Sequence, residues 1–289
     1  MTGRTDRRTM ASVDSYTPTE IAELVRTKGV TKATAPALTT FILGVLAGAF
    51  IGLGAVVATT ISAGSTLGYG PTKWLAGIGF SLGLILVVIA GAELFTGNNL
   101  ILMSWVSRRI SLGRLLRNWG LVYGGNLVGA LSVSVMVYLA GWWRQGEGAV
   151  GAAALATAAG KTSLPFGEIF FRGVLANALV CLAVWLATGG RSLIDKVFAI
   201  VFPISAFVAA GFEHSVANME IVPLGLMLKG DEALTKTAAL SSSQLSSLDV
   251  GGVVRNIAGA TLGNIVGGAV LVGLVYWFVY LREADREPG

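Results

Sequence analysis

The 289-residue sequence predicts an all-α integral membrane protein with six transmembrane helices, arranged as two inverted three-helix repeats. Hydrophobic residues make up 54% of the chain and charged residues only 13%, and the 39 glycines allow close helix packing in a membrane. Several apolar runs exceed the roughly 18 residues that a spanning helix needs. The length of these runs argues against the alternative, a large soluble α/β enzyme.

Residues 1–37 form a polar, basic N-terminal segment, whose first 15 residues fit a disordered tail. Thr17, Pro18 and Glu20 predict a capping box with proline at the first helical position. A short amphipathic helix over residues 18–28 is expected to follow and to lie at the membrane surface.

The membrane domain is predicted over residues 38–281, with a cytoplasmic tail at 282–289. Its six spans are expected at 38–63, 74–105, 119–142, 167–188, 197–228 and 253–281. Spans two and five would each measure about 48 Å as straight helices, although a hydrocarbon core is only about 30 Å thick. Each also carries an acid and a Gly or Asn cluster, so both are predicted to be broken helices.

The distribution of Lys and Arg predicts the orientation of the chain. These residues are concentrated in the N-terminal segment and in the loop at 108–117. Both termini are therefore expected in the cytoplasm. Six spans agree with this, because an even number places both termini on the same side. The basic balance is explained by this location and gives no indication of nucleic-acid binding.

An internal repeat relates residues 38–142 to residues 167–281. The matched segments are 41–49 with 170–178, 90–93 with 210–213, 117–118 with 255–256 and 125–129 with 263–267, and Asn98 matches Asn218. Three spans map onto three spans, so the second half is inverted, as in many channels and transporters. Chance similarity of Gly/Ala-rich helices is the alternative, but the matched order of Glu, Asn and Arg argues against it.

His214 is the only histidine, and it lies beside Glu213 in the middle of span five. Ionisable residues at this depth are functional candidates. The equivalent position in the first half is Leu94, so the repeat loses its symmetry there, as expected for a single site on the pseudo-axis. Histidine can donate a proton or a hydrogen bond to a small anion. A satisfied core histidine is the alternative.

Glu93 and Glu213 are expected at the two helix breaks, where they would cap exposed N–H groups. Cation binding or proton relay is the alternative. Thr96 lies in the first break and offers a hydroxyl to His214 or to a substrate. Lys161 ends an Ala/Gly-rich outer loop, where it either concentrates anions or is an ordinary solvated lysine.

Three apolar residues have a spacing compatible with a pore. Phe80 and Leu84 are one turn apart, and Phe207 shares a helical face with His214. They are expected either to form hydrophobic constrictions on the two sides of His214 or to pack in the core. The sequence has no phosphate-binding loop, zinc-protease motif or Cys/His cluster, so neither a cofactor nor a metal is expected.

The chain resembles the formate/nitrite transporter family. The resemblance rests on the segments Gly91–Gly97, Leu179–Trp185, Gly211–Met219 and Leu262–Gly268. It implies an aquaporin-like fold, a homopentamer in membrane lipid and one pore per protomer for formate, nitrite or hydrosulfide, with acetate or lactate in some members. By motif match, His214 resembles the central pore histidine, Thr96 the loop threonine, and Phe80, Leu84 and Phe207 the constriction residues. The matched supporting polar residues are Lys161, Asn177, Glu213, Asn218 and Asn264.

Within the family, segments 190–196 and 202–207 are most similar to formate channels, and residues 159–162 are at least as similar to nitrite channels. The expected protein is a channel of the bacterial inner membrane, most similar to those for formate, in which His214 protonates the anion or the intact anion crosses. A membrane enzyme using Glu213 and His214 as an acid–base pair lacks an accompanying nucleophile. A water or glycerol channel lacks its paired Asn-Pro-Ala motifs.

Overall fold

The structure, a computed structural model, describes residues 14–286. Most of the predicted disordered tail, and the last residues of the predicted C-terminal tail, lie outside the described residues. All regular elements between residues 14 and 286 are helices. Five runs are long and apolar enough to cross a membrane: α2 (Ala37–Ser62), α3 (Tyr69–Ala90), α5 (Leu112–Leu139), α7 (Phe166–Gly189) and the continuous run Val250–Tyr280. This run comprises α12 (Val250–Ile265), a π-helical stretch (Val266–Leu274) and α13 (Val275–Tyr280). The predicted all-helical membrane class is confirmed.

The predicted second and fifth spans are both interrupted. After α3, Gly91 takes a left-handed conformation with φ of 85°, and a 3-10 turn (Gly97–Ile101) and α4 (Leu102–Val106) follow an extended stretch. After α8 (Leu193–Ala209), Gly211 takes φ of 70°, and α9 (Ser215–Leu228) begins four residues later. Glycine adopts positive φ without steric cost, so each helix ends just ahead of its glutamate.

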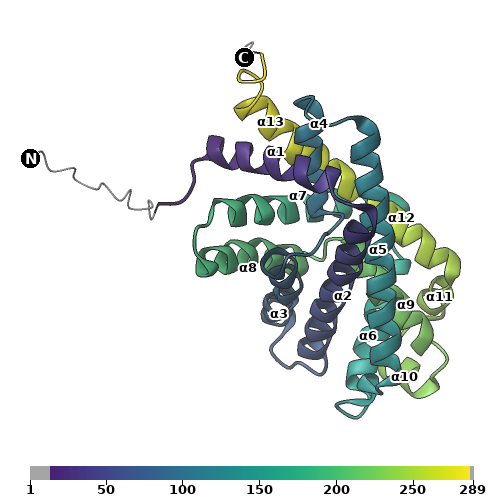
Figure 1. The fold of residues 1–289 in the computed structure, drawn as a ribbon. Coiled ribbons are helices and arrows are strands. Elements are labelled where there is room, and N and C mark those ends of the chain that lie inside the picture. Colours follow the sequence, from purple (N-terminus) through teal and green to yellow (C-terminus); the bar gives the residue numbers. More distant parts are fainter. Residues whose placement is uncertain (1–13, 287–289) are drawn as a thin grey trace, which may run out of the picture.

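The N-terminal helix α1 spans Pro18–Thr34 and begins with the predicted capping box. It continues beyond the predicted end at Lys28, because the small residues Gly29 and Ala33 are buried against the protein and packing overrides the low helix propensity of glycine. Its apolar face packs with Met103 and Trp185 in one buried cluster. Figure 1 shows α1 lying across the end of the molecule that also carries α4 and α13.

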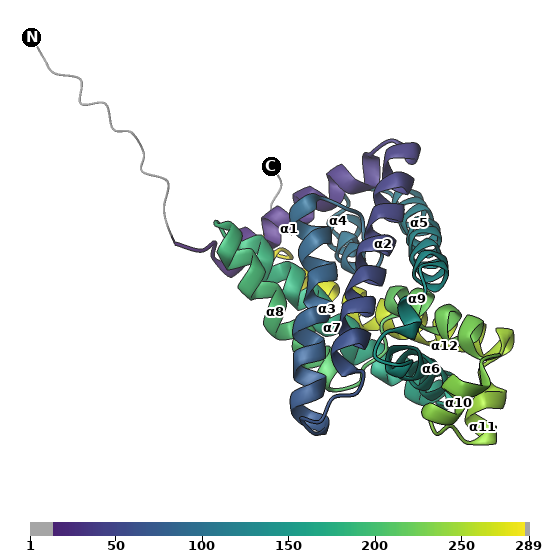
Figure 2. The ribbon, with the colours of Figure 1, turned by 90° about the horizontal axis from the view of Figure 1, so that it is seen from below.

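The Ala/Gly-rich segment before Lys161 was predicted as a loop, and this prediction is wrong. Residues Ala149–Thr162 form the helix α6, whose small side chains Ala154 and Ala158 are buried with Leu224 of α9. Alanine is the strongest helix former, so the composition is compatible with a tightly packed helix. The short helices α10 (Glu232–Thr237) and α11 (Ser242–Ser247) gather beside α6 (Figure 2).

Two helix pairs pack closely enough to set the position of the breaks. A Cβ added to Gly125 of α5 would lie 2.6 Å from the Phe41 carbonyl oxygen of α2, and one on Gly173 of α7 would lie 2.9 Å from the Ala260 carbonyl oxygen of α12. Only glycine permits this approach of two backbones. The close contact brings Asn126 and Asn264 within hydrogen-bonding reach of the two breaks.

Candidate functional site

His214 and Thr96 meet between the two helix breaks. The His214 Nε2 atom lies 2.9 Å from Thr96 Oγ1, and both side chains are buried. His214 is also the N-cap of α9, because its Nδ1 atom accepts the Ala217 backbone N–H at 3.1 Å. Since that N–H can only donate, the ring proton lies on Nε2 and points at the Thr96 oxygen. The imidazole is thus a neutral hydrogen-bond donor, and the Thr96 hydrogen is left to point elsewhere.

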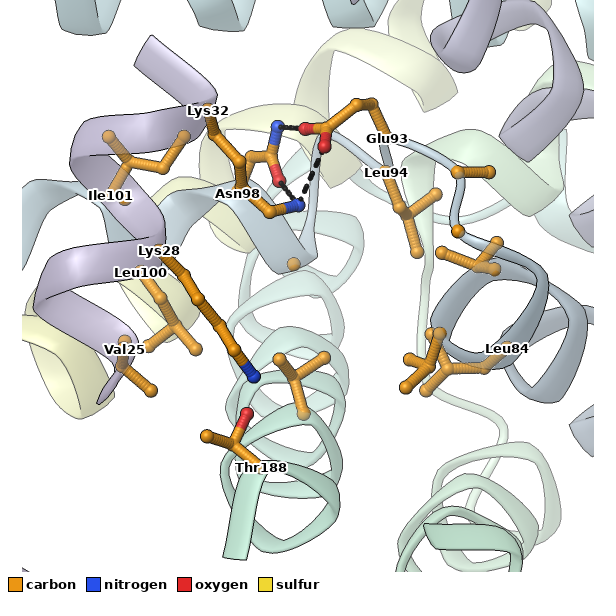
Figure 3. A pocket seen from close by; sticks show the side chains of 17 residues that line it. Val25, Lys28, Lys32, Leu84, Glu93, Leu94, Asn98, Leu100, Ile101 and Thr188 are labelled. Atoms are coloured by element: carbon orange, nitrogen blue, oxygen red, sulfur yellow. Dashed lines mark hydrogen bonds and ion pairs between the residues drawn. The ribbon is translucent and has the colours of Figure 1, made fainter. Parts of the chain in front are cut away.

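Cavities approach this pair from two sides. The first, named here the α1 cavity, has a volume of about 300 Å³ and is lined by α1, α3, α7 and the first break (Figure 3). The second, the α6 cavity, measures about 470 Å³ and contacts His214 directly. His214 thus faces the α6 cavity, and Leu94 and Gly97, on the two sides of Thr96 in the sequence, line the α1 cavity.

The three candidate constriction residues are divided between the cavities. Leu84 lines the α1 cavity, whereas Phe80 and Phe207 line the α6 cavity. The Phe80 and Phe207 rings meet edge to face at 5.4 Å between centroids, and the Phe207 ring centroid lies 5.9 Å from that of His214. All three side chains are buried. This arrangement agrees with apolar residues on both sides of the histidine, and their role as constrictions stays a prediction.

Glu213 holds a polar network on the wall of the α6 cavity. Its Oε1 atom accepts from Lys161 Nζ at 2.9 Å. Its Oε2 atom accepts from Asn218 Nδ2 at 2.6 Å and from Asn256 Nδ2 at 3.1 Å. The ammonium and the two amides stabilise a carboxylate at a depth where an unpaired one would be costly. The expected vestibule role of Lys161 stays a prediction, and its charge is compensated by Glu213.

Glu93 holds a matching network on the wall of the α1 cavity. Its Oε1 atom lies 3.0 Å from Lys32 Nζ, and its Oε2 atom accepts from Asn98 Nδ2 at 2.6 Å (Figure 3). Asn98 Nδ2 also lies 2.9 Å from Asn118 Oδ1, as Asn218 Nδ2 lies 2.8 Å from Asn256 Oδ1. Three contacts thus correspond between the two halves: glutamate with lysine, glutamate with asparagine, and asparagine with asparagine.

The expectation that the two glutamates cap the broken helices is wrong. Asn126 Oδ1 accepts the Phe95 N–H, and Asn264 Oδ1 accepts the Ser215 N–H, both at 2.9 Å. Their amide groups donate to Glu93 O and Glu213 O, again at 2.9 Å each. A neutral amide can both accept and donate within the break, whereas each carboxylate turns to its lysine because a buried charge needs a counter-charge.

Asn177 of α7 links the backbone of the first break to α12, which in turn bonds the second break. Its Nδ2 atom lies 2.7 Å from the Asn264 carbonyl oxygen and 3.3 Å from the Thr96 carbonyl oxygen. The Cys181 thiol donates to the same Thr96 oxygen at 3.3 Å. These bonds fix the Thr96 backbone through its carbonyl oxygen, and so they position the Thr96 hydroxyl that faces His214.

Lys32, Asn118, Asn126 and Asn256 were missed as site residues, although the internal repeat carried the signal for all of them. Lys161 lies 129 residues after Lys32, the same interval that separates Phe41 from Phe170. The asparagines stood in the matched segments 117–118, 125–129 and 255–256. Extending each matched position to its partner would have identified the full network.

Comparisons with known proteins identify the family of this chain. The family described as Formate/nitrite transporter matches residues 19–278. Formate channel FocA of Escherichia coli (strain K12) is 44% identical over 278 residues, which covers 95% of this chain and 98% of that protein. Formate channel FocA of Haemophilus influenzae is 38% identical and covers 90% of this chain and 93% of that protein.

Solved structures give the same assignment. A structure described as a pentameric formate channel with formate bound superposes with a TM-score of 0.78 at 41% identity, covering 85% of this chain and 98% of that chain. An ion channel of the same family gives a TM-score of 0.75 at 30% identity, covering 90% and 99%. The matched length, the identities and the helical fold together show that this chain is a multi-pass membrane protein of the formate/nitrite transporter family.

Proposed function

We propose that this protein is a formate channel of the bacterial inner membrane, with nitrite and hydrosulfide as the alternative substrates. The observation that carries the proposal is the buried Thr96–His214 pair between two cavities. Relatives described as formate channels, at 44% and 38% identity, favour formate as the first substrate.

The proposed path begins in either cavity, where the anion is still hydrated. At Leu84 on one side, or Phe80 and Phe207 on the other, the anion sheds water, which is costly for a bare charge in an apolar slit. It then meets the Thr96 hydroxyl, which donates a hydrogen bond while accepting one from His214 Nε2. This chain of donors compensates part of the lost hydration.

Proton transfer from His214 requires the hydrogen bond from the Ala217 N–H to its Nδ1 atom to break. The imidazole first takes a proton on Nδ1, which releases the Ala217 N–H. The Nε2 proton then moves to Thr96 Oγ1 as the Thr96 hydrogen moves to formate, and neutral formic acid leaves. The ring then carries one proton, on Nδ1, and the cap re-forms once Nε2 takes a proton from water and Nδ1 releases its own. In the rival mechanism, the intact anion crosses with the cap closed.

His214→Asn separates these mechanisms, because asparagine is a favoured N-cap and does not titrate. Flux of formate, nitrite and hydrosulfide into proteoliposomes is measured from pH 5 to 8. We expect wild-type flux to depend strongly on pH and His214→Asn to lose that dependence while remaining folded.

The matched control is Ser215→Ala, which removes a buried hydroxyl without a hydrogen-bond partner in residues 14–286. It should keep the wild-type pH profile. Equal, pH-independent flux in wild type and His214→Asn would exclude protonation at His214. Absence of formate flux at every pH, with nitrite or hydrosulfide flux retained, would exchange the proposed substrate for one of its alternatives.

We further propose six membrane passes in two inverted repeats, with both termini in the cytoplasm, and a homopentamer. The matched contacts of Glu93 and Glu213, and of Asn126 and Asn264, support the repeat. The solved relative described as pentameric, at 41% identity, supports the assembly.

A further inference from the structure

The α1 cavity is larger than one small anion requires. Its volume of about 300 Å³ compares with a share of about 30 Å³ per molecule in liquid water. Much of its wall is apolar, formed by the side chains of Val25, Leu84, Val87, Val88 and Val184. The cavity thus has room for a solute that combines a charged group with a short hydrocarbon tail.

Two lysines of α1 reach this cavity, and they differ in their partners. Lys32 is engaged, since its Nζ atom lies 2.9 Å from Asn98 Oδ1 and 3.0 Å from Glu93 Oε1. Lys28 forms no hydrogen bond or ion pair within residues 14–286. Figure 3 shows its ammonium end turned across the cavity toward the Thr188 hydroxyl of α7, which also lacks a hydrogen-bond partner in the described chain.

Lys28 lies near two other positive charges and has no acidic partner among the described residues. Partial burial lowers the pKa of Lys28, and the positive charges of Lys196 and Lys32 lower it further. The acidic group on the cavity wall, Glu93, is already paired with Lys32. An anion beside Lys28 would offset this repulsion and accept hydrogen bonds from both the ammonium and the hydroxyl.

We propose that the α1 cavity contains a binding site for a short-chain monocarboxylate, in which Lys28 and Thr188 bind the carboxylate and the valine wall contacts the hydrocarbon tail. This site lies apart from the Thr96–His214 pair. A carboxylate held there stands at the Leu84 end of the path, so one with a tail too bulky to pass Leu84 blocks the path from the α1 side.

Binding is tested with butyrate on the full-length protein in nanodiscs of deuterated lipid, by saturation-transfer NMR. The butyrate methylene protons should receive saturation from the protein. Lys28→Gln should weaken binding about tenfold or more, since hydrogen bonds to charged groups contribute roughly 1.5–3 kcal/mol. Thr188→Val, which keeps the side-chain shape, should weaken binding by a smaller factor. Neutral butanol should bind far more weakly than butyrate.

Lys73→Gln is the matched control, because Lys73 lines the α6 cavity. It should leave the butyrate signal unchanged. Equal binding of butanol and butyrate, or unchanged binding in Lys28→Gln, would overturn the proposal. Loss of the signal in Lys73→Gln alone would also overturn it, because the carboxylate would then bind in the other cavity.

A second measurement rests on the proposed function. Butyrate added on the α1 side of proteoliposomes should inhibit formate flux in wild type and should do so at about tenfold higher concentration in Lys28→Gln. Butyrate that binds through Lys28 but leaves wild-type formate flux unaffected would overturn the blocking role. Butyrate binding through Lys28 in a protein without formate flux would refute the proposed function and leave the binding site standing.

Discussion

Glu220 is a buried carboxylic acid of α9 outside the Thr96–His214 site. Its side chain is 1% exposed, its Oε1 atom has no hydrogen-bond partner in the described chain, and no lysine or arginine in that part pairs with it. A Cβ on Gly52 would lie 3.2 Å from Glu220 Cγ, so the acid sits against α2 and near Val133 of α5. This environment favours an apolar side chain of similar volume.

Glu220→Met should therefore stabilise the protein. Methionine fills irregular apolar gaps, and a buried polar group without a hydrogen-bond partner costs about 1–3 kcal/mol. We expect the thermal midpoint to rise by several degrees, since about 1 kcal/mol corresponds to ~2–4 °C in a protein of this size. Glu220→Gln should give a smaller change. If Glu220→Met folds but loses formate flux, the acid has a transport role instead.

At the scale of elements, Asp285 ties α1 to the opposite end of the chain. Its Oδ1 atom accepts from Arg26 at 2.6 Å, and its Oδ2 atom accepts from Ser107 at 2.6 Å and from Trp277 at 2.9 Å. Partial burial acts to raise the pKa of Asp285, but the hydrogen bonds of Ser107 and Trp277 and the charge of Arg26 outweigh it. The pKa of this carboxyl therefore lies below its ordinary value.

The direction of this pKa shift predicts the pH range in which Asp285 stabilises the docking of α1. The stabilisation by Asp285 is complete above the unfolded-state pKa of about 3.9 and is lost as the pH falls through the lower folded-state value. Hydrogen exchange of the α1 amides, corrected for intrinsic rates, should thus show constant protection from pH 5 to 8. Asp285→Asn should reduce that protection roughly tenfold or more.

Glu23→Gln is the control for Asp285→Asn. Glu23 also pairs with Arg26, but its side chain is 41% exposed, so its contribution should be small. Equal protection in Asp285→Asn and wild type would show that the apolar face of α1 alone holds the helix in place.

At the scale of the whole molecule, the proposed six passes can be tested with single cysteines. Cys181 is the only native cysteine and is buried, so Cys181→Ala provides the background. Ser111→Cys and Ser192→Cys, at exposed positions just before α5 and α8, should be labelled by an impermeant maleimide from the cytoplasmic side. Thr66→Cys, between α2 and α3, should be labelled from the other side. Labelling of Ser111→Cys and Ser192→Cys from opposite sides would contradict the proposed topology.

Both helix breaks could be predicted because acids at membrane depth and nearby glycines are local patterns in the sequence, whereas the inverted repeat stays a prediction. For the Thr96 hydroxyl, the sequence left open whether it contacts His214 or a substrate. Sequence periodicity does not show how the two helix breaks face each other, so the contact with His214 could not be chosen in advance. The helix α6 was missed because Ala/Gly composition fits both a packed helix and a loop. The approach of Lys28 to Thr188 depends on how α1 docks, which no local pattern contains.

Under the proposed function, the pairing of Lys32 with Glu93 makes the charge at the channel entrance depend on the position of α1. If α1 swings away, Lys32 leaves with it, and the Glu93 carboxylate at the rim of the path loses its counter-ion. The mouth becomes wider but repels anions, so geometry and electrostatics change the flow in opposite directions. Under the proposed function, detaching α1 thus replaces a neutral ion pair at the entrance with an unpaired carboxylate that repels anions.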